Sequence, residues 1–162
     1  MDNSQEIDKL FTNDFPEKPL SLCFLGDEVL RKKCDPVADF SDKFNKFMNN
    51  MHKAMKKFGG IGLAAPQIGV SLRAIVVEIN KRVILLANPE IINCSDGIIC
   101  EEEGCLSIPG QVFSVERTGF IEIKARTVTG GRIHFEADGL FARALQHEID
   151  HLDGVLICDK EW

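Results

Sequence analysis

Two histidines, His147 and His151, lie four residues apart near the end of the sequence and enclose Glu148 in the segment QHEIDHLDG, residues 146–154. On an α-helix, residues four apart point to the same side, because each residue turns the helix by about 100°. Two imidazoles presented in this way can hold a metal ion, and a carboxylate beside them can move the proton of a water molecule. The spacing therefore predicts a hydrolytic metal site on a helix near the C-terminal end.

Two histidines do not complete such a site, because a catalytic metal usually has three protein donors and an open position for water. A third histidine six residues after the second is absent, since Ile157 occupies that position. The best upstream candidate is Cys105 in EEEGCLSIPG, residues 101–110, where the preceding glycine lets backbone approach closely. Cys100 and Cys105 could instead form half of a structural zinc site, but no second cysteine pair has matching spacing. One thiolate, two imidazoles and a water fit better.

A glycine-rich segment, GGIGLAAPQIGV at residues 59–70, is a third candidate for chemistry. It lacks the Lys-Ser/Thr ending of a phosphate-binding loop and does not follow a strand of a dinucleotide-binding unit, so phosphate binding is not expected. Small residues there let backbone lie close to a substrate, and Gln67 can donate an amide N–H.

The elements that position these residues can be read from periodicity. Phenylalanines and methionines at helical spacing predict a core-facing helix that Ser41 can cap and that ends at Gly59. Alternating segments at 73–79 and 82–88 predict one hairpin, and FIEIKARTV with RIHFEA predicts a second. The terminal helix is expected at about 139–152. This order favours an α+β fold with antiparallel strands packed around the terminal helix that carries HExxH.

Composition limits the protein class. A net charge of −6 and a pI near 5.2 argue against direct DNA binding, and the longest aliphatic run, residues 83–87, is too short to cross a membrane. The six cysteines are scattered in a chain long enough to bury a core, so we expect free thiols in the cytoplasm. We expect residues 1–20 to form a mobile or loosely docked extension and residues 21–162 to form a single domain.

The segments GIGLAAPQ, EGCLS and QHEIDHLDG, in this order, closely resemble those of the peptide deformylase family, and the resemblance extends over roughly residues 22–158. It implies the peptide deformylase α+β fold. It also implies hydrolytic removal of the formyl group from the N-terminal formylmethionine of new polypeptides.

The resemblance also assigns roles by position. The metal ligands that it implies are Cys105, His147 and His151. Glu148 corresponds to the general base, while the side chain of Gln67 and the backbone N–H of Leu106 correspond to the oxyanion donors. Gly62 corresponds to the residue whose backbone pairs with the substrate. The residues that line or border the methionine pocket by this resemblance are Ile61, Glu103, Gly104, Leu140 and Ala144.

The resemblance further implies one divalent metal ion per chain, with Fe²⁺ in the cell and Zn²⁺, Ni²⁺ or Co²⁺ able to occupy the same site. The expected partners are formylmethionyl nascent peptides, with at most weak or transient ribosome contact. Residues 152–162 are too few for the long C-terminal helix with which some relatives contact the ribosome.

Some positions depart from the family pattern or leave alternatives open. Val112 occupies a position where many members carry an arginine at the substrate mouth, so Arg143 is expected to border the pocket instead. Asp150 either pairs with Arg117 or is an ordinary surface aspartate. A zinc endopeptidase would share the two-histidine helix but would need a long cleft and a ligand other than a thiol. A non-catalytic binding protein is the other alternative, although no group that the chemistry needs is missing.

Overall fold

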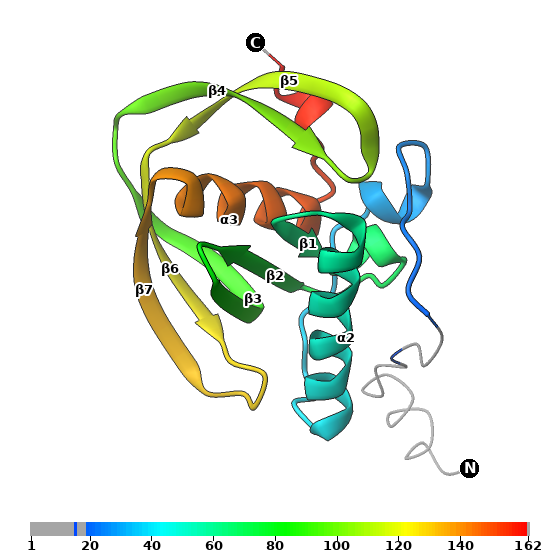
Figure 1. Cartoon of the computed structure of the whole chain (residues 1–162). Coiled ribbons are helices and arrows are strands. Elements are labelled where there is room, and N and C mark those ends of the chain that lie inside the picture. The colour runs from blue at the N-terminus through cyan, green and yellow to red at the C-terminus, as the bar shows by residue number, and fades with distance from the viewer. Residues whose placement is uncertain (1–14, 16–18, 162) are drawn as a thin grey trace, which may run out of the picture.

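The computed structural model describes Phe15 and residues 19–161. Most of the predicted extension, residues 1–20, therefore lies outside the described residues. Figure 1 shows the long helix α3 (Gly139–Leu152) running between two antiparallel sheets. The larger sheet has the order β1 (Gly62–Ala64), β2 (Ala74–Ile79), β3 (Arg82–Cys94), β6 (Phe120–Arg126) and β7 (Arg132–Asp138). The smaller sheet is the pair β4 (Ile98–Cys105) and β5 (Ile108–Thr118). This arrangement confirms the predicted α+β class.

The larger sheet is covered by a helix on each face. Alternate residues of β2 point in opposite directions, so that Ile75 and Val77 join the core beneath α3, while Val76 joins the core beneath α2 (Asp42–Phe58). Three short 3₁₀ helices, η1 (Glu28–Arg31), η2 (Ala65–Ile68) and η3 (Ile157–Asp159), complete the described secondary structure. No helix in the described part of the chain is both long and apolar enough to cross a bilayer.

The predicted helix and hairpins are confirmed with small differences. Helix α2 buries its phenylalanines and methionines and ends at Gly59, whose φ of 77° suits glycine. Ser41 occupies the N-cap position, but its side chain makes no cap hydrogen bond, so that part of the prediction is wrong. The turn between β2 and β3 has Asn80 and Lys81 at φ 51° and 66°, as a tight hairpin requires. Strand β3 continues to Cys94, beyond the predicted residue 88.

The hairpin of β4 and β5 positions the cysteine side of the site. Its pairing is regular from Ile98 opposite Thr118 to Gly104 opposite Val112, and then shifts so that Cys105 lies opposite Ile108. This irregularity puts Cys105 at the end of β4, next to the turn. The hairpin crosses over α3, and the C-terminal segment reaches it through a bridge between Glu161 and Val115. The site therefore lies where the smaller sheet meets the helix.

Candidate metal centre and substrate pocket

The three side chains expected to bind metal lie together. Sγ of Cys105 is 3.4 Å from Nε2 of His151, and that nitrogen is 3.3 Å from Nε2 of His147. All three atoms lie within 4.8 Å of one another, and no other such group of three or more candidate ligands occurs in the part of the chain that the structure describes. The histidines come from successive turns of α3 and the cysteine from the end of β4. Cys100 is not a member of this group.

The chemistry of this donor set fits a divalent transition metal, because one sulfur and two imidazoles are typical ligands of zinc and iron. Burial, with the charges of His147 and Arg117, lowers the pKa of His151 well below its ordinary 6.5, so its ring is neutral, as a ligand must be. Burial also disfavours a charge on His147, but hydrogen bonding to Cys105 and Glu103 outweighs it and raises the pKa of His147 to about 10. The surroundings of His147 thus stabilise positive charge, which a cation would supply.

Glu148 lies beside these ligands with a carboxylate that is not fully used. Its residue is 4% exposed, and Oε2 has no hydrogen-bond partner in the described part of the chain. Burial raises the pKa of Glu148 to about 7, against the opposing charges of His147 and Arg117. A pKa near neutrality suits a group that must both accept and return a proton. A side chain at Gly62 would overlap Oε1 of Glu148, so glycine lets β1 approach the carboxylate.

Gln67 in η2 is held in a fixed orientation. Its Oε1 accepts a hydrogen bond from the backbone N–H of Ala64 at 2.9 Å. Its Nε2 then points toward the site, where it donates to Oγ of Ser107 at 3.2 Å and lies 3.6 Å from Sγ of Cys105. Leu106, which follows the cysteine, lines the same pocket. The amide of Gln67 is therefore an N–H donor next to the candidate metal centre.

A buried network of charges connects the two sides of the site. Nε of Arg117 donates to both carboxylate oxygens of Glu103, at 2.8 and 2.9 Å, and Nη1 donates to Asp150 at 2.8 Å. Oε1 of Glu103 lies 3.5 Å from Nδ1 of His147, which leaves Nε2 of that ring directed at the other ligands. Burial alone would raise the pKa of Glu103, but the contacts with His147 and Arg117 hold it below its usual value.

This network settles one open alternative, because Asp150 is the ion-pair partner of Arg117. It also gives Glu103 contacts that the sequence analysis missed. These contacts depend on how the β4–β5 hairpin crosses α3, so residue spacing in the sequence provided no signal for them.

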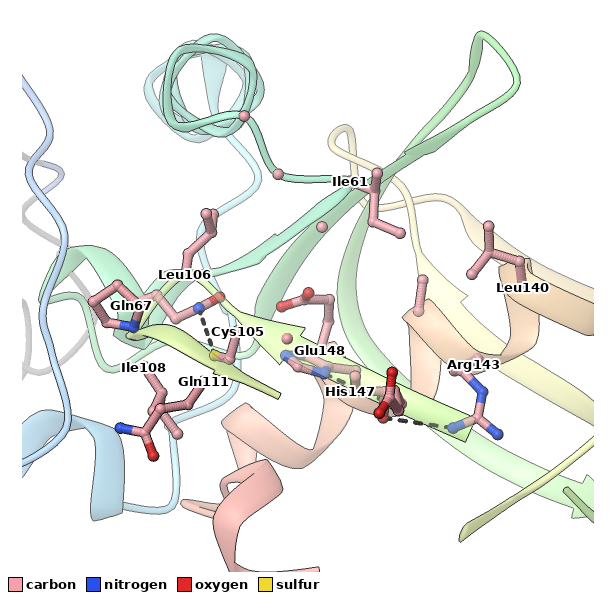
Figure 2. A pocket seen from close by; sticks show the side chains of 18 of the residues that line it. Ile61, Gln67, Cys105, Leu106, Ile108, Gln111, Leu140, Arg143, His147 and Glu148 are labelled. Carbon is pink, nitrogen blue, oxygen red and sulfur yellow. Dashed lines mark hydrogen bonds and ion pairs between the residues drawn. The ribbon is translucent and has the colours of Figure 1, made fainter. Parts of the chain in front are cut away.

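The pocket beside Glu148 has a volume of about 520 Å³. Figure 2 shows Gln67 and Leu106 on the left, Ile61 and Leu140 on the right, and Cys105, Glu148 and His147 between them. The lining residues that were expected to bind substrate are Ile61, Gly62, Glu103, Gly104, Leu140 and Ala144. Arg143 also lines the pocket, whereas Val112 is not among the lining residues and is 62% exposed. His151 is not among the lining residues.

All six cysteines are free, in agreement with the expected reduced thiols. Cys34 is buried and Cys100 is exposed, while Cys105 is intermediate and reaches both the pocket and the histidines. Of the six, Cys105 is the one that the structure brings to the candidate centre.

Comparisons with known proteins agree with this geometry. The family model described as polypeptide deformylase matches residues 19–161. A peptide deformylase of Thermodesulfovibrio yellowstonii is 48% identical over 139 residues, which are 83% of this chain and 84% of that protein. The crystal structure of a peptide deformylase from Thermotoga maritima superposes with a TM-score of 0.88 at 37% identity, over 90% of this chain and 99% of that one.

A second solved structure, a peptide deformylase from Synechococcus elongatus in complex with actinonin, has a TM-score of 0.86 at 38% identity and covers 93% of this chain and 84% of that one. The family match spans both sheets, α3 and all the pocket residues, so it includes every element that builds the site. By its sequence, its fold and the placement of its cysteine and two histidines, the chain belongs to the peptide deformylase family.

Proposed function

We propose that this chain hydrolyses the formamide at the N-terminus of formylmethionyl peptides and releases formate. Water adds its oxygen to the formyl carbon, the bond from that carbon to the amino nitrogen breaks, and the nitrogen leaves as a free amine. The observation that carries the proposal is the cluster of Cys105, His147 and His151 beside Glu148, whose Oε2 has no hydrogen-bond partner among the described residues and which lines the pocket of a family member.

In this proposal Cys105, His147 and His151 hold one divalent ion. Such an ion, when bound, lowers the pKa of water toward neutrality, as zinc hydrolases do at about 7. The sulfur and imidazole donors are compatible with Fe²⁺, which we propose as the ion in the cell, and also with Zn²⁺, Ni²⁺ or Co²⁺. We place the activity in the cytoplasm, with weak or transient ribosome contact.

Glu148 is the proposed general base and acid. Its carboxylate accepts the proton of the attacking water and then delivers it to the leaving amine, a role worth about 10²–10⁴ in rate. The buried, partly unpartnered state of this carboxylate supports the assignment.

Negative charge that develops on the formyl oxygen needs donors at a fixed place. Nε2 of Gln67 is held in place by the bond between Oε1 and Ala64, and the backbone N–H of Leu106 is the second proposed donor. Preorganised donors of this kind cost nothing to reorient during the reaction.

The substrate backbone has a place between the two sheets. Among the described strands, β1 is the edge strand of the larger sheet and β4 pairs only with β5, so an extended peptide can lie between their free edges. Gly62 on β1 is the proposed pairing residue, and the methionine side chain then extends between Ile61 and Leu140.

The test is formate release from formyl-Met-Ala-Ser by protein prepared without oxygen, together with metal analysis. We expect one formate for each new amine and about one metal ion per chain. Acetyl-Met-Ala-Ser and an internally cleavable peptide serve as controls, and cleavage of the internal peptide without formate release would favour an endopeptidase. Metal-loaded protein that releases no formate would contradict the proposal.

A further inference from the structure

Arg143 is a charged residue in the wall of the pocket, and the proposed reaction gives it no part. It lies on α3 between Leu140 and His147, and its side chain is 8% exposed. Figure 2 shows it next to Leu140 on the helix that forms one side of the pocket. Burial of a cation is costly unless its N–H groups are all paired, so its contacts indicate what it does.

The guanidinium of Arg143 is directed to the β4–β5 hairpin. Nη2 donates to the carbonyl of Ile99 at 2.7 Å, and Nη1 donates to the carbonyl of Val115 at 3.0 Å. Nε lies 3.0 Å from Glu101, and Nη1 lies 3.6 Å from Glu103. These four contacts reach both strands and neutralise the charge. A planar guanidinium held in this way is fixed and is not available to an anionic ligand.

The part of Arg143 that lines the pocket is therefore its aliphatic stem. A long cationic side chain can bury its methylenes while its head group binds elsewhere. Ala144, the next residue, also lines the pocket and contributes only a methyl group. Ile61 and Leu140, about half exposed at 50% and 55%, form apolar sides near the opening. The space bounded by these four residues suits an unbranched apolar side chain.

We propose that Arg143 is a specificity-determining residue that limits the length of the first side chain of the substrate. The inference rests on the proposed function, since it concerns the side chain next to the formyl group. A side chain longer than methionine would have to displace a group that two carbonyls and two carboxylates hold in place. Displacing it would break buried hydrogen bonds, which is unfavourable.

The test compares formyl-Met-Ala-Ser with formyl-ethionine-Ala-Ser, whose thioether side chain is one methylene longer. For the unaltered protein we expect kcat/KM to favour the methionine peptide by about tenfold or more, the usual effect of one methylene in a close-fitting pocket. In Arg143→Leu the shorter side chain opens the pocket toward the hairpin, and we expect the preference to fall to near equality. Arg143→Lys keeps a positive charge for Glu101 and Glu103 but has a smaller head group. We therefore expect a partial decrease in the preference for the methionine peptide.

The control is Arg82→Leu. Arg82 lies over the ring of Phe141, 4.6 Å from its centroid, and Phe141 packs against Phe135 of β7 rather than lining the pocket. This variant should keep the preference of the unaltered protein. The inference is overturned if both Arg143 variants retain metal and keep the full preference for methionine. It is also overturned if both variants lose the metal, since Arg143 would then hold the hairpin in place rather than limit the substrate.

If the proposed function itself is wrong, the same experiment gives a different result. In that case the unaltered, metal-loaded protein releases no formate from either peptide.

Discussion

At the scale of single residues, Glu148 carries the proposed proton transfer. Its neutral isostere in Glu148→Gln fits the same buried space but cannot accept a proton. We expect turnover of formyl-Met-Ala-Ser to fall by about 10²–10⁴, while the metal content stays the same because Glu148 is not a proposed ligand. Formate release and metal analysis on the same preparation measure both. The matched control is Glu136→Gln, an exposed position on β7, which should leave turnover unchanged.

Gln67 has a separate role, so its loss should have a separate effect. Gln67→Ala removes the N–H donor next to Cys105, and losing one preorganised donor commonly costs about 10²–10³ in turnover. The substitution also leaves the N–H of Ala64 without its acceptor, so the far-ultraviolet circular dichroism spectrum and the metal content should be measured together with kcat. Undiminished kcat with the metal retained would remove Gln67 from the proposed mechanism.

The types and spacing of the residues predicted the group that the structure brings together. His147 and His151 share a helix face by local geometry alone, and the placement of Cys105 next to them agrees with the motif resemblance. The contacts of Arg143 and Glu103 could not be read in the same way. They depend on how a hairpin crosses a helix, and sequence spacing does not encode that crossing.

At the scale of elements, the close approach of β1 to α3 depends on Gly62, which has no side chain. In Gly62→Ala the new methyl would overlap the carboxylate of Glu148, so either the strand or the carboxylate must move. We expect kcat to fall with the metal retained, because the ligands lie on β4 and α3 rather than on β1. Gly97→Ala is the control, since a methyl there meets nothing within 4 Å. Equal activity of the two variants would show that Glu148 need not be held where the structure has it.

The hairpin and α3 are joined by Arg117. Arg117→Met leaves Glu103 buried without its main partner, and breaking a buried pair in this way costs about 3–5 kcal/mol. Lys124→Met is the comparison, because the exposed pair of Lys124 with Glu90 is worth roughly 0–1 kcal/mol. Urea unfolding of the two variants at matched metal content measures the difference. Similar losses of stability in the two variants would mean that the Arg117 network does not hold the hairpin against α3.

Periodicity and turn residues predicted α2, α3 and two of the three hairpins, because those elements are defined by neighbouring residues. The hairpin of β4 and β5 had no such signal. Its strands contain the run Glu101, Glu102 and Glu103 instead of an alternating pattern, and its turn at Leu106 and Ser107 contains no glycine or asparagine. Its separation from the larger sheet depends on long-range pairing and on α3.

At the scale of the whole molecule, the metal should act as a link between the smaller sheet and α3. Removing it with a chelator should lower the thermal midpoint, since an ion at about 100 times its Kd adds about 2.7 kcal/mol to stability. For a chain of this size each kcal/mol corresponds to about 2–4 °C. In Cys105→Ser the added metal should raise the midpoint much less. Calorimetry with and without metal checks this, and equal midpoints in the unaltered protein would contradict the link.

The proposed ligands come from positions far apart in the sequence, with Cys105 on β4 and both histidines on the last long helix. While the chain is being synthesised, a ribosome that has not yet released residues 139–152 carries a polypeptide with one of the three donors and no general base. Activity would therefore begin only after residues 139–152 have been translated and have left the ribosome.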